Sequence, residues 1–184
     1  MQSKVKYKTD KDLVNACVQG KRDAQEVLYK TYADKMFAIC KTYAQNRDDA
    51  CEYLQLGFIQ VFTKLNQFSF TGSLEGWIRR VIVTTALQEL RKQKHYQVNI
   101  DDLNISHYTE EDEIEGFQGL PFNKVIEYVN ELPKKAGLVL KLFAIEGYSH
   151  QEIAKQLSIS ISTSKSQLNY ARSLLKKRVS DLNG

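Results

Sequence analysis

Residues 149–178 carry polar side chains at helical spacing that suit contacts with nucleic acid. Ser149 is followed three residues later by Glu152, a capping box that predicts the start of a helix. The stretch SISIS predicts a turn, and a second helix follows it. Its predicted outward side chains are donors and acceptors of the kind that reach base edges and phosphates in a major groove. They are Ser162, Thr163, Lys165, Ser166, Gln167, Asn169 and Tyr170.

Small and apolar residues in the same segment predict that its two helices pack together. The inner face of the first helix carries Ile153, Ala154 and Leu157, and that of the second carries Leu168, Ala171, Leu174 and Leu175. Helix, tight turn and helix form the helix-turn-helix pattern, and no acidic residue interrupts it from Ser160 to Ser180. The alternative is a solvated helix face, because serine and lysine are common there. His150 is expected on the solvent face of the first helix.

The first half of the chain offers a second set of basic and aromatic side chains. Single-stranded bases are held by basic grooves and aromatic pockets, and residues 66–94 supply materials for both. These are Asn66, Gln67, Phe68, Phe70, Arg79, Arg80, Arg91, Lys92 and Lys94. Trp77 lies on an apolar stripe, which favours core packing over base stacking, and Phe68 is open to the same two interpretations.

The spacing of apolar residues predicts the helices that position these side chains. Steps of three and four residues are typical of amphipathic helices, and they recur along most of the chain. The stretches concerned are 10–20, 27–43, 50–65, 74–90, 122–129 and 136–144. The 184 residues contain only two prolines, Pro121 and Pro133, so helices can run uninterrupted through the first 120 residues. The first half shows no alternating pattern typical of β-strands. We therefore predict an all-α fold.

Charge divides the chain into three parts that the net value of +4 conceals. Residues 1–97 hold 16 basic and 10 acidic side chains, residues 98–120 hold 7 acidic and no basic ones, and residues 121–184 hold 10 basic and 5 acidic ones. The middle part also lacks apolar periodicity, as linkers do. We predict two small helical domains at 9–97 and 121–184, joined by an acidic flexible linker at 98–120.

Several classes of protein are excluded by composition. No apolar run approaches the ~20 residues that cross a bilayer, and no signal peptide follows the N-terminal lysines, so a cytoplasmic protein that is not membrane-embedded is expected. Cys17, Cys40 and Cys51 have no metal-ligand spacing and are predicted to be free thiols. The sequence contains no Gly-rich phosphate loop or HExxH motif, so we expect no enzyme, no catalytic residue, no metal and no cofactor.

Three segments resemble, in the right order, the functional segments of RNA polymerase sigma factors of the extracytoplasmic-function class. The polymerase-binding helix of that family is similar to DDACEYLQLGFIQVF. Its segment for recognising and melting the downstream promoter element is similar to FSFTGSLEGWIRRVIVTTALQELRK. Its upstream-element domain is similar to LPKKAGLVLKLFAIEGYSHQEIAKQLSISISTSKSQLNYARSLL. The resemblance covers nearly the whole chain apart from the linker and the first dozen residues.

This resemblance implies roles for particular residues. The helix over 48–65 would dock on the coiled-coil clamp of the polymerase through Asp49, Glu52, Gln55 and Phe58. The alternative for Asp49, Glu52 and Gln55 is a solvated helix face. For Phe58, core packing is the favoured interpretation. The loop before residue 74 would receive a flipped base. Thr84 is a further candidate DNA-binding residue, in the helix that would help to melt the downstream promoter element.

Four residues depart from the family's usual pattern. Thr84 stands where asparagine is common, Gln88 where aspartate is common, and Gln167 where arginine is common. The frequent turn glycine is replaced by Ser158, which is tolerable if the backbone there avoids a strained positive φ.

The implied function is promoter-specific initiation of transcription without covalent chemistry. Its partners would be core RNA polymerase, promoter DNA and an anti-sigma factor. The acidic linker would thread the polymerase cleft, or it is a solubilising spacer. The alternative function is that of a sigma-like helical interaction protein that binds a regulator without initiating transcription.

Overall fold

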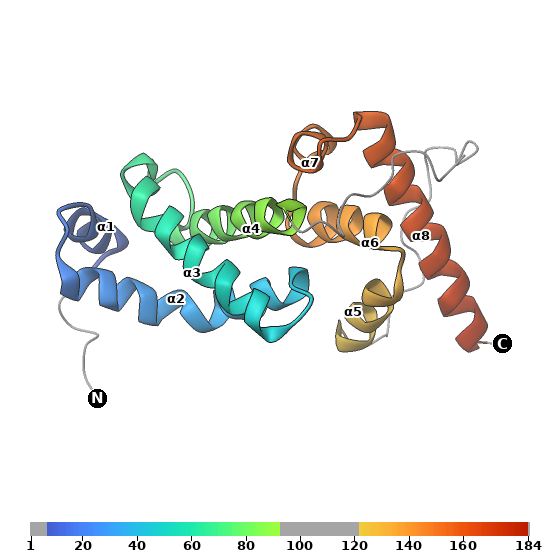
Figure 1. Cartoon of the computed structure of the whole chain (residues 1–184), viewed down its shortest axis with the longest axis horizontal. Coiled ribbons are helices and arrows are strands. Elements are labelled where there is room, and N and C mark those ends of the chain that lie inside the picture. The colour runs from blue at the N-terminus through green and yellow to red at the C-terminus, as the bar shows by residue number, and fades with distance from the viewer. Residues whose placement is uncertain (1–6, 93–121, 184) are drawn as a thin grey trace. The chain divides into compact units, whose positions relative to one another are not determined.

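The computed structural model describes residues 7–92 and 122–183. Within these ranges the chain forms helices and contains no strand, which confirms the predicted all-α class (Figure 1). Two compact units divide between residues 97 and 98, and each is described by itself. The predicted linker at 98–120 lies outside the described residues, and the predicted domain boundaries stay predictions.

The N-terminal unit is built from four α-helices and one turn of 3₁₀ helix. They are α1 (Asp10–Val18), α2 (Arg22–Tyr43), α3 (Arg47–Lys64), η1 (Leu65–Gln67) and α4 (Leu74–Lys92). Side chains cap the first turns, because Thr9 accepts a hydrogen bond from the backbone N–H of Asp12 and Asn46 from that of Asp49. Helix α3 packs against both α2 and α4, while α1 packs on α2.

The core of this unit follows the predicted apolar stripes. Its fully buried side chains recur at helical steps on the three long helices: Leu28, Met36, Tyr53, Val61, Ile78, Ile82 and Leu87. Gly57 of α3 lies against Ile82 of α4. A Cβ atom added there would lie 2.5 Å from Ile82 Cδ1 and 3.5 Å from Ile82 Cα. Any side chain at position 57 would therefore force the buried Ile82 side chain to shift.

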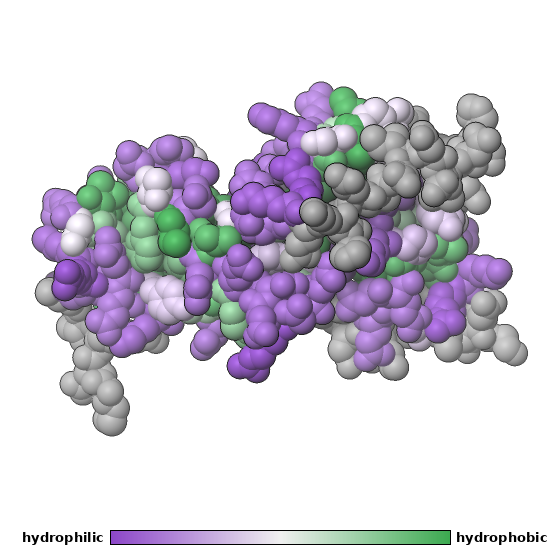
Figure 2. All heavy atoms as spheres, viewed as in Figure 1, coloured by the Kyte–Doolittle hydropathy of each residue, from purple (hydrophilic) through white to green (hydrophobic). Residues whose placement is uncertain are grey.

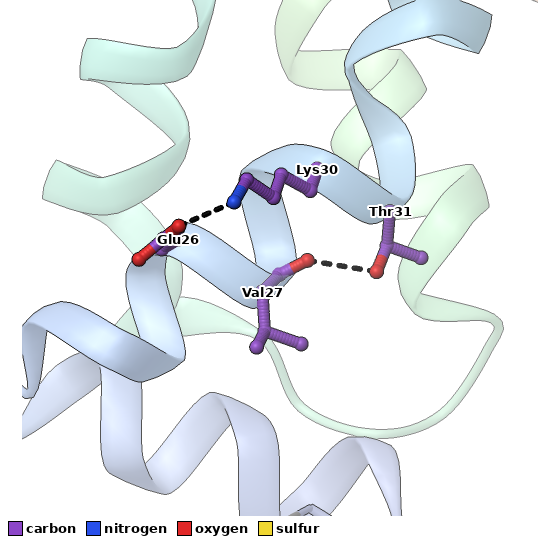
Figure 3. A network of polar contacts seen from close by, with 4 residues as sticks. All are labelled: Glu26, Val27, Lys30 and Thr31. Atoms are coloured by element: carbon purple, nitrogen blue, oxygen red, sulfur yellow. Dashed lines mark hydrogen bonds and ion pairs between the residues drawn. The ribbon is translucent and has the colours of Figure 1, made fainter. Parts of the chain in front are cut away.

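Polar side chains cover the outer surface of α2. Glu26 and Lys30 form an ion pair one turn apart, and the Thr31 hydroxyl donates to the Val27 carbonyl at 2.7 Å (Figure 3). Exposed pairs of this kind contribute about 0.3–0.5 kcal/mol. Figure 2 shows hydrophilic atoms over most of the visible surface and a smaller hydrophobic area on the N-terminal unit.

The C-terminal unit contains the predicted helix-turn-helix. Its elements are α5 (Phe122–Glu131), α6 (Lys134–Leu140), a π-helical turn η3 (Lys141–Ile145), α7 (His150–Leu157) and α8 (Ile161–Asn183). Helix α8 packs against α5, α6 and α7. The predicted capping box is present, with the backbone N–H of Ser149 donating to Glu152 Oε2 at 2.9 Å and that of Glu152 donating to Ser149 Oγ at 3.3 Å. None of the helices in the described ranges is long and apolar enough to cross a membrane.

Candidate polymerase and nucleic-acid interfaces

The outer face of α3 presents the polar residues of the candidate polymerase site. Glu52 and Gln55 are exposed one turn apart, and Asp49 is half-buried one turn before them. The Asp49 backbone is fixed by its 2.8 Å hydrogen bond to Asn46 Oδ1, so this face begins at a capped helix end. A carboxylate and an amide on a rigid helix give charge complementarity and register to a docking surface.

Phe58 does not belong to that exposed face. Its side chain is only 3% exposed, and its ring lies 4.7 Å from Tyr29 and 6.1 Å from Phe62, centroid to centroid. The favoured interpretation as core packing is therefore correct, and burial removes Phe58 from the candidate contact surface. The exposed apolar group on α3 is instead Ile59, at 58% exposure. In the sequence, Ile59 is an apolar residue outside the apolar stripe of its helix, and this position would have identified it as an exposed apolar group.

The loop before α4 combines buried and exposed aromatic rings. Asn66 and Gln67 are exposed on η1, while Phe68 is buried with its ring 5.7 Å from Trp77. These two rings belong to the packing of the loop, so Phe68 is not available for base stacking in this structure. Phe70 is 43% exposed and has φ +60°, a rare conformation for a bulky residue. It is the accessible ring of the loop.

Basic and polar side chains share the outward stripe of α4. Arg80, Gln88 and Arg91 are exposed and Thr84 is half-buried, at helical steps of three and four residues. Arg79 is half-buried beside this stripe, and Lys92 pairs with Glu89 at 2.7 Å near the helix end. The structure therefore brings Arg80, Thr84 and Arg91 to one stripe of α4, with Arg79 and Lys92 on either side of it.

The candidate upstream-element face lies on α8. Ser162 and Lys165 are exposed, and Thr163, Ser166, Asn169 and Tyr170 are half-buried. Ser160 caps this helix by accepting a hydrogen bond from the Thr163 backbone N–H at 2.9 Å. Its hydroxyl also lies 2.7 Å from Ser162 Oγ and 2.8 Å from Thr163 Oγ1. The first turn thus presents a group of linked hydroxyls.

Gln167 is not on that face, which corrects its predicted outward position. Its side chain is 4% exposed, and within the described residues its Oε1 atom has no hydrogen-bond partner. The cause is the helical register, because Gln167 lies three residues after Ser164 and four before Ala171, which are both fully buried. It packs inside the helix-turn-helix.

His150 is likewise not a solvent-facing residue. The imidazole is half-buried between elements, with Nδ1 2.9 Å from Ser164 Oγ on α8. Its ring stacks on Phe143 of η3 at 4.8 Å. Burial lowers the pKa of His150 below its usual 6.5, and the positive charges of Lys165 and Arg172 lower it further.

Ser158 adopts a left-handed conformation that glycine would take without strain. It ends α7 with φ +55° and ψ +44°. A residue with a Cβ atom pays about 1 kcal/mol for this conformation. We expect Ser158→Gly to stabilise the C-terminal unit by about 0.5–1 kcal/mol, and so to raise its melting temperature by about 2–8 °C in calorimetry.

Ser158→Ala is the matched control for this substitution. Alanine keeps the Cβ atom and loses the hydroxyl, so it should not raise the melting temperature. Equal stabilisation by glycine and alanine would show that the side chain, and not the positive φ, determines the effect.

The cysteines of the N-terminal unit are free thiols, as predicted. Cys17 and Cys40 are buried and Cys51 is half-buried. Burial raises the pKa of Cys17 to about 11 and that of Cys40 to about 12, so both stay protonated at neutral pH. No group of three or more His, Cys, Asp or Glu side chains in residues 7–92 and 122–183 is placed to hold a metal ion.

Two family models match the chain in the order of its two units. Sigma-70 region 2 matches residues 28–96, and Sigma-70, region 4 matches residues 122–175. Together these matches span about two thirds of the 184 residues. The chain belongs to the sigma-70 family.

Its relatives place this sigma-70 protein in the extracytoplasmic-function class. It is 24% identical to the ECF RNA polymerase sigma factor SigW of Bacillus subtilis, over 89% of this chain and 93% of the relative. It is also 24% identical to the ECF RNA polymerase sigma-E factor of Haemophilus influenzae, over 95% and 97% of the two chains. The solved structure of CnrH in complex with the cytosolic domain of CnrY has the same fold, with a TM-score of 0.51, 17% identity and coverage of 94% and 97%.

Proposed function

We propose that this sigma factor works through three surfaces. These are the outer face of α3 for core RNA polymerase, the α4 stripe with the preceding loop for the downstream promoter element, and the outer face of α8 for the upstream element. As a member of its family, the chain binds core RNA polymerase and promoter DNA and directs promoter-specific initiation of transcription. The observation that carries this conclusion is the presence of both sigma regions in one chain. It disfavours the alternative of a protein that only binds a regulator.

On α3, polar residues would set the orientation of the polymerase clamp and an apolar residue would anchor it. Glu52 and Gln55 supply charge and hydrogen bonds, while affinity needs apolar area that becomes buried on binding. Ile59 provides such area one turn after Gln55 on the same helix. The exposed Tyr29 of α2 packs its ring on the buried Phe58.

In the downstream element, the basic residues of α4 would hold the backbone and the loop would hold an unpaired base. Arg80 and Arg91 are suited to phosphate contacts along the stripe. Asn66 and Gln67 offer hydrogen bonds to a flipped base, and Phe70 offers a ring on which a base can stack. The Phe70 ring packs on the buried Phe68 ring at 4.8 Å, centroid to centroid, and is still 43% exposed.

At the upstream element, the exposed side chains of α8 would enter the major groove.

We expect Lys165→Ala to weaken binding to upstream-element duplexes uniformly and to reduce the slope of log affinity against log salt by about one unit, since one phosphate contact is lost. Titrations at several salt concentrations measure this slope. Lys155→Ala on α7, also exposed, is the control. An unchanged slope for Lys165→Ala would contradict a phosphate contact at this position.

The chain would act by binding alone, without covalent catalysis, and in the cytoplasm, where polymerase and chromosome meet. A third partner would be an anti-sigma factor. CnrH, which shares the fold, was solved with the cytosolic domain of CnrY bound.

Run-off transcription with purified core polymerase tests the whole proposal. The templates are fragments of the genome of the source organism, and core polymerase without the chain is the control. Transcripts with defined start sites that depend on the chain are expected. If no genomic fragment yields such a transcript, the regulator-binding alternative replaces this function.

A further inference from the structure

A hydrogen bond links the two helices of the helix-turn-helix behind the candidate DNA face. It joins His150 Nδ1, in the first turn of α7, to Ser164 Oγ, in the first half of α8, at 2.9 Å. Ser164 is fully buried, so its hydroxyl is shielded from water. The next residue along α8 is the exposed Lys165, a candidate DNA contact. The bond therefore lies one residue from the surface that would read the promoter.

The imidazole is enclosed by an aromatic ring and positive charges. From η3 it meets the Phe143 ring, whose centroid is 4.8 Å away with an interplanar angle of 24°. From α8 the charges that act on it are those of Lys165 and Arg172, and the Arg172 guanidinium also lies 5.9 Å from the Phe143 centroid.

Two other ionisable groups near His150 form hydrogen bonds of their own. Lys141 of η3 donates to Asn130 Oδ1 at 2.8 Å. On the helix of His150 itself, the Glu152 carboxylate accepts hydrogen bonds from the Ser149 backbone and hydroxyl, each at 2.9 Å. Burial, Lys165 and Arg172 are the causes of the lowered pKa of His150, and no carboxylate is among them.

These surroundings favour the neutral imidazole. Burial first, and then Lys165 and Arg172, hold the pKa of His150 below the usual 6.5. The N-terminal end of α7, with its positive partial charge, acts in the same direction. Because the folded-state pKa is below the unfolded one, the contribution of neutral His150 to stability is complete above about pH 6.5. It is lost as the pH falls from there through the folded-state value.

We propose that His150 and Ser164 are a positioning pair that aligns α8 on α7 for upstream-element recognition, and that this alignment requires a neutral imidazole. The inference rests on the proposed role of α8 in DNA binding. A third positive charge beside Lys165 and Arg172 would displace α7 relative to α8. The exposed residues of α8 would then no longer match the base edges, so discrimination between promoter and random DNA would weaken in acid.

The test measures discrimination with the complete chain bound to core RNA polymerase. The probes are a duplex selected by the wild-type complex from a random-sequence pool at about pH 7.5, and a scrambled duplex of the same composition. The ratio of the two affinities removes the general electrostatic effect of pH on DNA binding. It is measured at about pH 7.5 and about pH 5, with far-UV circular dichroism of the chain under both conditions.

Three variants separate positioning from simple structural support. His150→Asn keeps an amide near the place of Nδ1 and cannot be protonated in this range. Ser164→Ala removes the buried hydroxyl and keeps the imidazole. Ser173→Ala is the matched control, because its hydroxyl donates to the Tyr170 carbonyl of the same helix at 2.9 Å.

We expect the wild-type ratio to fall about tenfold between the two pH values with the chain still folded, and the His150→Asn ratio to change less than twofold. Ser164→Ala should show an approximately tenfold lower ratio already at about pH 7.5, and Ser173→Ala should match the wild type. A wild-type ratio that is independent of pH, the same pH dependence in His150→Asn, or a loss that coincides with unfolding overturns the inference alone. Absence of any discrimination by the wild type at about pH 7.5 overturns the proposed role of α8 as well.

Discussion

Glu52→Lys is expected to weaken binding of the chain to core RNA polymerase about 100-fold, or ~2.8 kcal/mol. Glu52 is exposed on the outer face of α3, between the half-buried Asp49 and the exposed Gln55. A surface with carboxylates at these steps suits a basic partner, and placing like charges together across an interface costs several kcal/mol. Because the side chain is exposed, the free energy of unfolding should change by less than about 0.5 kcal/mol. Titration of labelled chain with core polymerase measures the affinity.

Glu26→Lys makes the same change of charge elsewhere in the same unit. Glu26 is exposed on α2 and forms an ion pair with Lys30 of the same helix, so its substitution alters net charge equally on a helix that does not carry the candidate face (Figure 3). We expect its polymerase affinity to stay within about twofold of the wild type. If both variants lost affinity equally, net charge and not the face of α3 would govern binding.

The helices could be predicted because their signals are local. The capping box of Ser149 and Glu152 and the apolar steps through Leu28 and Met36 each lie within a few residues, and the structure contains them as expected. The break at Pro133 follows from the missing backbone N–H in the same way. The all-α class and the helix-turn-helix are consequences of these local patterns.

Positions that depend on helical register or on contacts between helices were harder to predict. Gln167 resembles its polar neighbours in sequence, but counting three residues from Ser164 and four to Ala171 places it inside. His150 was expected in solvent because its contacts are with Phe143 and Ser164, which lie on other elements. The sequence of its own helix gives no sign of these contacts. A single sequence does not reveal such pairs before the helices are packed.

Two residues other than glycine in the described part of the chain have a positive φ, and they were hard to predict for a different reason. Glycine usually marks a positive φ, and neither Ser158 nor Phe70 carries that signal. The resemblance to the family pointed to Ser158, because a turn glycine is frequent there. For Phe70 no sequence signal existed. In the loop before α4, the sequence therefore identified the aromatic residues but did not predict which of their rings are exposed.

Gly57→Val is expected to destabilise the N-terminal unit by about 3 kcal/mol, at the upper end of overpacking effects. Even the first added carbon would lie 2.5 Å from Ile82 Cδ1, and Ile82 is fully buried. Two further methyl groups would have to displace α4 from α3. Calorimetry should show a melting temperature lower by about 12–24 °C for a unit of this size. Gly72→Val is the control, since no heavy atom lies within 4 Å of a Cβ added there.

A double-mutant cycle isolates the contact responsible. Ile82→Val deletes the Cδ1 atom that a Cβ at position 57 would meet, so it should cost about 1 kcal/mol alone but much less in a Gly57→Ala background. Such coupling would locate the α3–α4 crossing at this atom pair, whereas additive effects would contradict the close approach. The crossing matters for function because α3 carries the proposed polymerase face and α4 the proposed downstream-element face. Because a side chain at position 57 would force Ile82 to shift, we expect Gly57 to influence the angle between these two proposed faces.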